Sequence, residues 1–186
     1  VLTPASQQFP RHGRARAGHP STPRKVLLNT WEAVYFNHDV AELQRLADAA
    51  AAVGVERFVL DDGWFRGRDD DTSSLGDWYV DTTKYPDGLD PLIAHVTGLG
   101  MQFGLWVEPE MVNPDSDLYR QHPDWALHFP GRPRTEGRNQ LILNFARKDV
   151  QEHVFGVLDR LLAENDIRFF KWDMKRHFSE PGWPAM

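Results

Sequence analysis

Short apolar runs alternate with amphipathic segments from residue 25 onward. Four runs have the length and the unbroken hydrophobicity of strands buried on both faces, and they read "KVLLNTW", "RFVLDDG", "QFGLWVEPE" and "IRFFKWDM". Apolar residues at helical spacing lie between successive runs. This alternation predicts parallel βαβ units, with helices covering the sheet.

Local sequence predicts where the first long helix begins and ends. Asp39 is expected to be its N-cap, Glu42 to complete a capping box, and Gly54 to terminate the helix. The apolar positions between these boundaries follow helical spacing: Val40, Leu43, Leu46, Ala47 and Ala50.

Two further helices are predicted downstream. Asp90 as an N-cap and Pro91 at the first helical position begin a short helix that closes near Gly98 or Gly100. The other comes after a loop region that contains a short helix near 115–121 and a minor strand at "LILNF". Its expected apolar face comprises Val150, Val154, Val157, Leu158, Leu161 and Leu162.

Polar side chains gather where the predicted strands finish. They are Asn29, Asp61, Asp62, Glu108, Glu110, Lys171 and Asp173. Barrels of the (β/α)8 type carry their chemistry at this end of the strands. A dinucleotide-binding sheet would need a glycine-rich phosphate loop after its first strand, and this sequence has none. The predicted fold class is therefore α/β, as the first half of a (β/α)8 TIM barrel, because a whole barrel takes about 250 residues.

The predicted half barrel spans residues 25–186. Residues 1–24 are rich in Pro, Arg, Gly, His and Ser without an apolar period, and we interpret them as a linker or basic arm. The chain starts at Val1 and stops within the loop-like "SEPGWPAM". We therefore expect a truncated catalytic domain.

The chain has a net charge of −6, with 21 basic and 27 acidic residues, and it contains seven Trp and eleven Phe. An acidic, aromatic body does not suit a nucleic-acid backbone, which is bound by clustered cations. It suits an uncharged ligand held by carboxylates and flat rings. The chain has no Cys, so disulfides and thiolate metal sites are excluded. No membrane span or signal peptide is recognised, and we expect a cytoplasmic protein.

Asp61 and Asp62 directly follow an apolar strand. Adjacent strand residues face opposite ways, so both carboxylates reach one ligand only if the strand bends there, and Gly63 permits the bend. The alternative is a turn or capping aspartate with a solvated neighbour. Acids recur at the ends of three strands, and this recurrence favours ligand binding.

Glu108 and Glu110 flank Pro109 at the end of the third strand. Either acid could anchor the loop, by accepting backbone N–H groups or by pairing with Arg138, or could bind a substrate directly. Trp106 lies two residues before Glu108 and points to the same face. A core indole is the default interpretation for Trp106, and a platform for a sugar ring is the alternative.

Lys171 and Asp173 share a face at the end of the fourth strand. A lysine alongside an aspartate lowers the pKa of the carboxyl group and keeps it charged. An ionised, partly desolvated carboxylate is what a nucleophile requires. A structural ion pair at the strand end is the alternative.

No metal site is expected. The stretch "DDDTSSLGDW" (69–78) lacks the oxygen spacing of an EF-hand loop and is interpreted as a polar loop. The histidines at 38, 95, 122, 128, 153 and 177 lack the spacing of zinc ligands.

Several long strings resemble glycoside hydrolase family 36, the microbial α-galactosidases. They are "LLNTWEA", "FVLDDGWF", "SSLGDWYVD", "FGLWVEPEMVNPDSDLY", "HPDWAL", "GRPR", "GRNQLIL" and "KWDMKR", and together they extend over residues 24–184. The resemblance implies a retaining enzyme with a (β/α)8 barrel and no metal or organic cofactor. Its substrates would be α-galactoside oligosaccharides such as melibiose or raffinose, and relatives often assemble as homo-oligomers.

The resemblance also implies roles for individual residues. Asp173 matches the nucleophile, which forms a covalent galactosyl-enzyme. Asp61 and Asp62 match the pair that binds the 4- and 6-hydroxyls of galactose. Three further residues match sugar contacts or the pocket wall: Lys171, Arg138 and Trp106.

The sequence departs from the family pattern in two places. The acid/base of the family lies on a later barrel strand, so we expect it to be absent from this chain, beyond Met186. Lys175 stands where the family usually has an asparagine that touches the sugar near its 2-hydroxyl. A lysine has no acceptor and brings a cation close to Asp173.

The leading hypothesis is a partial catalytic domain of an α-galactosidase that is inactive on its own. One alternative is a truncated, non-catalytic fragment with residual sugar binding. Another is a related galactosyl-transferring enzyme with the same pocket.

Overall fold

Four strands form one parallel sheet in the computed structural model, which describes residues 23–179. The strands are β1 (Leu27–Asn29), β2 (Arg57–Leu60), β3 (Gln102–Val107) and β6 (Phe169–Trp172), and they lie side by side in that order. All three neighbouring pairs are parallel. The four predicted strands and the α/β class are confirmed. The proposed linker, residues 1–24, lies outside the described residues except for its last two.

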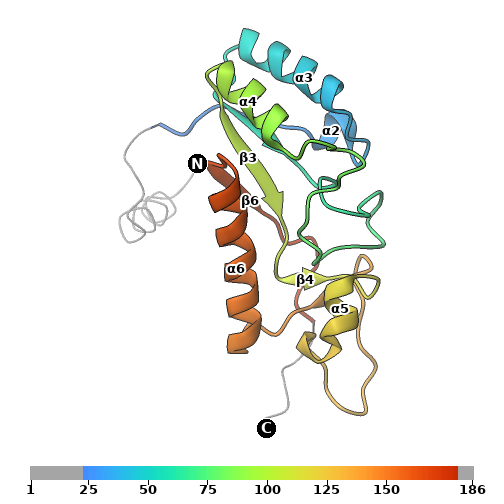
Figure 1. Ribbon diagram of the computed structural model, residues 1–186. Helices are drawn as coiled ribbons and strands as arrows, with labels where there is room; N and C mark the ends of the chain where they lie inside the picture. Colours follow the sequence, from blue (N-terminus) through green and yellow to red (C-terminus); the bar gives the residue numbers. More distant parts are fainter. Residues whose placement is uncertain (1–22, 180–186) are drawn as a thin grey trace, which may run out of the picture.

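Helices connect the strands (Figure 1). After β1 come α2 (Trp31–Val34) and α3 (Val40–Ala52), α4 (Asp90–Gly98) precedes β3, and α6 (Lys148–Glu164) precedes β6. Figure 1 shows α3 and α4 side by side, with α6 running along the sheet.

The predicted boundaries of α3 are confirmed. The Asp39 carboxylate accepts a hydrogen bond from the Glu42 N–H at 2.8 Å, and Gly54 has a positive φ of 87° just after the helix. The predicted start of α4 is wrong by one residue. Leu89 is its N-cap, Asp90 is its first residue, and no side chain caps it. Leu89 is 2% exposed, so burial of an apolar side chain fixes this start in place of a polar cap.

The apolar face of α6 is narrower than predicted. Val150, Val154 and Leu161 are buried, whereas Leu162 is 48% exposed. Successive helical residues point about 100° apart, so a leucine directly after a buried one lies outside a narrow stripe.

The chain leaves the sheet between β3 and α6 and forms a small lobe. There β4 (Met111–Val112) pairs antiparallel with β5 (Leu141–Ile142), and α5 (Asp117–Gln121) and the 3₁₀ helix η1 (Pro123–Trp125) lie between them in the chain. The predicted short helix and minor strand are confirmed. The arrowhead of β3 points toward β4 and α5 in Figure 1, so this lobe lies at the carboxyl end of the sheet.

An aromatic cluster lies beneath that end of the sheet. Trp64, Phe65, Trp78 and Trp106 are almost completely buried, and the rings of Phe65 and Trp106 stack with centroids 6.3 Å apart. The Trp64 indole N–H donates to the Trp106 carbonyl at 2.9 Å. Large flat rings at fixed angles give a rigid base to the residues that follow β2 and β3.

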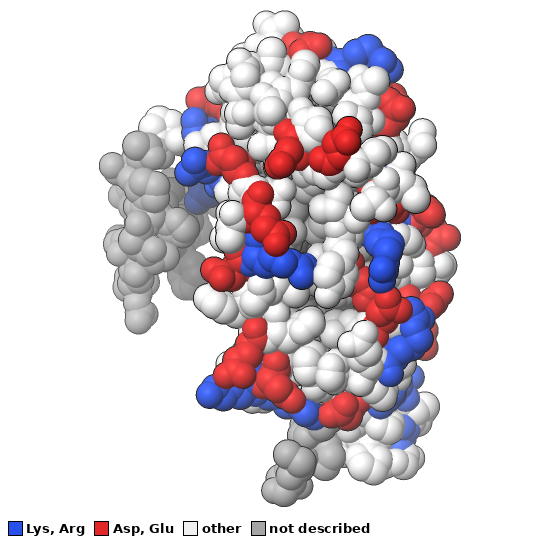
Figure 2. Space-filling view, in the orientation of Figure 1, with Lys and Arg blue, Asp and Glu red and all other residues white. Residues whose placement is uncertain are grey.

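No helix among residues 23–179 is long and apolar enough to cross a membrane. On the face shown in Figure 2, Lys and Arg lie in small groups beside Asp and Glu.

Candidate active site

Four acids and three cations meet at the carboxyl end of the sheet. Asp61 and Asp62 follow β2, Glu108 follows β3, and Asp173 follows β6. The cations that contact them are Arg68, Lys171 and Lys175. Five of the seven polar residues predicted to gather at this end take part in these contacts: Asp61, Asp62, Glu108, Lys171 and Asp173. The Asn29 side chain instead accepts from the Trp31 N–H.

Asp61 is held from two sides. Its backbone N–H donates to the Thr30 hydroxyl at 3.0 Å, and its Oδ2 accepts from the Lys171 ammonium at 2.6 Å. Asp61 is 2% exposed, and a buried carboxylate needs a cation or several donors. The expected pairing of Lys171 with Asp173 is therefore wrong, because Lys171 reaches across β3 to the buried Asp61.

The Asp62 side chain is completely buried and forms ion pairs with two cations, Arg68 and Lys175. Arg68 forms a two-point contact with its carboxylate, Nε to Oδ1 and Nη2 to Oδ2, both at 2.9 Å, and the Lys175 ammonium adds a third bond to Oδ2 at 2.7 Å. Burial alone would raise the pKa of Asp62. The hydrogen bonds and charge of Arg68, with the charge of Lys175, outweigh burial and hold that pKa below its usual value.

The bend predicted at Gly63 is present. Gly63 has a φ of 116°, a region that side chains rarely adopt, and an added Cβ would lie 3.0 Å from the ring of His38. His38 is 6% exposed; its Nδ1 lies 2.6 Å from the Tyr85 hydroxyl and its Nε2 lies 3.1 Å from the Tyr35 carbonyl oxygen. The turn that presents Asp61 and Asp62 therefore rests on a fixed imidazole.

Asp173 is half-buried and lies one residue past β6. Its backbone N–H donates to the Val107 carbonyl at 2.8 Å, which continues the ladder with β3. The Trp106 indole N–H donates to Oδ2 at 3.0 Å, and the Met174 N–H donates to Oδ1 at 2.8 Å. Both oxygens are thus oriented by neutral donors.

Glu108 is a buried anchor for the chain after β6. Its Oε1 accepts the Lys175 backbone N–H, and its Oε2 accepts from the Gln140 amide at 3.0 Å. Burial raises the pKa of Glu108, and the nearby charge of Asp173 acts in the same direction. Of the two alternatives for Glu108, these contacts favour the loop anchor, although its partners are Gln140 and Lys175 rather than Arg138.

Arg138 lies in a tight turn and pairs outside the cluster. Arg138 and Asn139 have positive φ values of 55° and 60°, and the turn is closed by hydrogen bonds of 3.2 and 3.0 Å between Gly137 and Gln140. This is the backbone of a type I′ turn, which arginine rarely adopts. The Arg138 guanidinium is half-exposed and lies 3.8 Å from the Asp71 carboxylate.

Two indoles flank the Lys175 ammonium. Its Nζ lies 4.6 Å from the ring centre of Trp106 and 5.0 Å from that of Trp31. Trp106 is completely buried, whereas Trp31 is partly exposed. The Lys175 ammonium thus lies between the Asp62 carboxylate and two indole rings.

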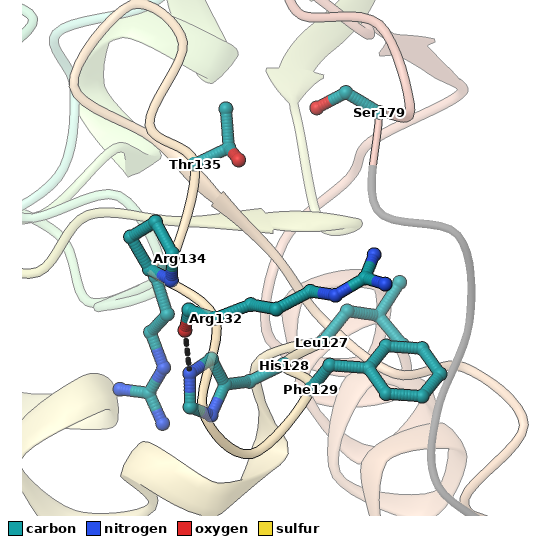
Figure 3. A pocket seen from close by; sticks show the side chains of 8 residues that line it. Leu127, His128, Phe129, Arg132, Arg134, Thr135 and Ser179 are labelled. Carbon is teal, nitrogen blue, oxygen red and sulfur yellow. Dashed lines mark hydrogen bonds between the residues drawn. The ribbon is translucent and has the colours of Figure 1, made fainter.

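A separate pocket of 280 Å³ lies in the lobe (Figure 3). It is lined by Leu127, His128, Phe129, Arg132, Pro133, Arg134, Thr135 and Ser179. None of these residues belongs to the acidic cluster, but Arg176 connects the two places, because its guanidinium donates to the carbonyls of Thr135 and Gln140 at 2.7 and 2.6 Å.

Residues 23–179 contain no group of three or more His, Asp or Glu side chains arranged to hold a metal ion. Among the histidines of this part of the chain, His95 pairs with Asp48 at 2.7 Å and His38 contacts the Tyr85 hydroxyl at 2.6 Å.

Sequence reasoning missed three residues of the site. Arg68 lies in a loop without apolar period, six residues after the aspartate that it binds. Gln140 comes from the lobe, far in the chain from the Glu108 that it contacts, and Trp31 lies two residues after β1 and contacts Lys175 beyond β6. Trp31 and Gln140 stand within the quoted strings "LLNTWEA" and "GRNQLIL", which could have identified them.

A family model described as melibiase matches residues 2–186. The chain belongs to the melibiase family. It is 52% identical over 172 residues to the α-galactosidase AgaA of Geobacillus stearothermophilus, and 52% identical over 159 residues to an α-galactosidase of Escherichia coli. These alignments cover 92% and 86% of this chain but 24% and 22% of the relatives. The melibiase chain thus spans about a quarter of the length of these curated relatives.

Solved structures agree with the family assignment. The glycoside hydrolase family 36 α-galactosidase AgaB of Geobacillus stearothermophilus superposes with a TM-score of 0.84 at 55% identity, over 88% of this chain and 22% of AgaB. A variant of AgaA in complex with raffinose has a TM-score of 0.83 at 53% identity, over 88% of this chain and 23% of that one. The resemblance to family 36 drawn from the sequence motifs is confirmed.

Proposed function

We propose that this melibiase segment is the first half of the (β/α)8 catalytic barrel of a retaining α-galactosidase. Four parallel strands in chain order, with the charged side chains at their carboxyl ends, support this reading. The relatives at about 50% identity are α-galactosidases, and solved relatives hold raffinose and stachyose. Hydrolysis of terminal α-galactosyl groups from oligosaccharides follows as the proposed activity.

Asp173 is the proposed nucleophile, and the orientation of its carboxylate is the observation that carries the proposal. Both oxygens accept from neutral donors, the Trp106 indole and the Met174 N–H, so the group is fixed without being bound to a cation. Asp173 is half-buried beside the acids that follow β2 and β3. A fixed, partly desolvated carboxylate at the end of a barrel strand suits attack on an anomeric carbon.

The proposed reaction has two steps. A carboxylate oxygen of Asp173 bonds to C1 of the galactosyl group as the bond from C1 to the leaving oxygen breaks, and an acid/base carboxyl group protonates that oxygen. Water then bonds to C1 and releases Asp173, while its proton returns to the acid/base. Glu108 does not suit the acid/base role, because it is completely buried, whereas Asp173 is only half-buried, and its oxygens anchor the chain through Gln140 and Lys175. The acid/base is therefore proposed to come from outside residues 1–186, and this chain alone is proposed to be inactive.

Asp61 is the proposed acceptor for one of the 4- and 6-hydroxyls of galactose. The resemblance to family 36 assigns the other hydroxyl to Asp62, whose carboxylate is already bound by Arg68 and Lys175. Lys171 holds Asp61, and Lys171 and Arg138 are proposed to contact further hydroxyls. The rare backbone conformation of Arg138 supports a functional placement, since strained residues concentrate at binding sites. Trp106 would form the base of the pocket, beneath Lys175.

The test replaces Asp173 in the full-length protein. Asp173→Ala should lower hydrolysis of an aryl α-galactoside by at least about 10³-fold, as loss of a covalent nucleophile does. Asp115→Ala, which removes an exposed carboxylate of the lobe, serves as the control. Labelling with a 2-fluoro galactosyl inactivator, followed by digestion, should place the label on the peptide that contains Asp173. A label on another peptide would overturn the assignment.

A further inference from the structure

The Asp62 carboxylate has little capacity left for a ligand. A carboxylate accepts about four hydrogen bonds, and three are already supplied by Arg68 and Lys175. Its side chain is 0% exposed. A sugar hydroxyl therefore cannot approach Asp62 at Oδ2 while the Lys175 ammonium stays in place.

Lys175 is the partner of Asp62 that reaches the surface. Its side chain is 14% exposed, whereas that of Arg68 is 0% exposed. The ammonium is fixed at its tip by Asp62 and by the faces of Trp31 and Trp106. Its backbone is fixed by the bond from its N–H to Glu108. Both the backbone and the ammonium group of Lys175 are thus held in place by contacts with the site.

We propose that Lys175 is a specificity-determining residue of the sugar site, and that its ammonium meets the ligand where Asp62 would otherwise do so. This inference rests on the proposed function. An ammonium has three donors and no acceptor, so the ligand must supply an acceptor at this position. A hydroxyl, an ether oxygen or a fluorine can accept, and a hydrogen atom cannot. The site therefore takes α-galactosides in which fluorine replaces the hydroxyl at this position, which an open carboxylate would reject.

Binding of substituted galactosides to the full-length protein tests the proposal, and all proteins of this series carry Asp173→Ala so that the sugars are not hydrolysed during the measurement. Methyl α-galactoside is compared by calorimetry with analogues in which each ring hydroxyl in turn is replaced by fluorine or by hydrogen. At the hydroxyl that meets Lys175, we expect the fluoro analogue to bind within about threefold of the parent and the deoxy analogue to bind about tenfold more weakly. The proposal is overturned if fluorine and hydrogen weaken binding equally at every position.

Two variants distinguish the effect of the hydrogen-bond donors of Lys175 from the effect of the length of its side chain. Lys175→Met keeps the length of the side chain but has no donor, so Asp62 becomes the group that meets the ligand. In this variant the fluoro analogue should bind at least about tenfold more weakly than the parent. Lys175→Arg keeps donors and should keep the wild-type preference. If Lys175→Met does not fold, the wild-type series and Lys175→Arg still decide, because loss of fluorine tolerance in Lys175→Arg contradicts the proposal.

The outcomes distinguish this inference from the proposed function. A wild-type protein that does not bind methyl α-galactoside overturns the galactoside site, and the inference with it. Binding with the same ratio of parent to fluoro affinity in wild type and in Lys175→Met overturns the inference alone.

Discussion

Arg66 and Arg68 lie two residues apart in one loop, and each binds an aspartate in opposite surroundings. The side chains of Arg68 and Asp62 are both 0% exposed, whereas those of Arg66 and Asp117 are 61% and 43% exposed. Water screens the exposed pair and can replace either partner. In the buried pair, removal of either residue leaves the charge of the other without a partner and without water. An arginine–aspartate pair therefore fixes the geometry of the site where it is buried and contributes little to the structure where it is exposed.

Removal of the buried cation gives the largest expected effect. Arg68→Met leaves Asp62 buried with Lys175 as its one remaining cation, and should lower the free energy of unfolding by about 3–5 kcal/mol. Urea unfolding measures this loss. The matched control, Arg66→Met, should leave the midpoint within experimental error. Equal losses in the two variants would show that burial does not distinguish the pairs.

A buried and a partly exposed histidine, His38 and His95, should differ in the same way in how they affect the pH dependence of stability. Burial lowers the pKa of His38 to about 4, and the charge of Lys84 acts in the same direction, whereas the charge of Asp62 opposes it. Between pH 6.5 and pH 4 the unfolded chain therefore binds more protons at this position than the folded one. The contribution of neutral His38 is fully present above pH 6.5 and is lost as the pH falls to 4, by about 3 kcal/mol.

The measurement is the free energy of unfolding at pH 7 and at pH 4.5, in wild type and in His38→Asn. The loss on acidification should be clearly smaller in the variant. His95→Asn removes a partly exposed histidine at the surface of α4 and should keep the wild-type loss. An unchanged loss in His38→Asn would assign the acid sensitivity to other groups.

The sequence predicts those parts of the molecule that depend on neighbouring residues. The four strands were predictable because short unbroken apolar runs are typical of parallel strands. The expected burial on both faces holds for β2 and β3, whereas β1 and β6, at the two edges of the sheet, are partly exposed. Asp61, Asp62 and Asp173 were predictable as neighbours because the carboxyl ends of parallel strands share one edge.

The unpredicted parts depend on tertiary contacts and burial that no local sequence pattern describes. Lys171 pairs with Asp61 rather than Asp173, because a long side chain can reach the buried acid across an intervening strand. The bond of Arg68 to Asp62 comes from a loop whose course no periodicity describes. Leu89 begins α4 through burial, although leucine is not a capping residue.

Backbone conformation gives a third contrast, between Gly63 beneath the site and Gly98 at the end of α4. Gly63→Ala places a Cβ 3.0 Å from His38 at a φ of 116° and should destabilise the protein by about 1–3 kcal/mol. Gly98 has open space around it, so Gly98→Ala should be neutral or slightly stabilising. Thermal unfolding compares the two variants. A Gly63→Ala protein as stable as Gly98→Ala would contradict the tight fit beneath Asp61 and Asp62.

The smallest expected effect concerns an exposed acid that binds backbone rather than a cation. Asp39 caps α3 by accepting the Glu42 N–H, a donor that has no partner within the helix, so Asp39→Ala should cost about 1 kcal/mol. Asp39→Asn keeps an acceptor oxygen at the same place and should retain most of this stability.

Asp48→Ala removes an exposed acid that pairs with His95 and should change the urea midpoint less than Asp39→Ala does. Exposure alone therefore does not make a charge dispensable, because an exposed carboxylate still stabilises the fold where it satisfies a backbone donor. Equal midpoints for Asp39→Ala and Asp48→Ala would contradict this distinction.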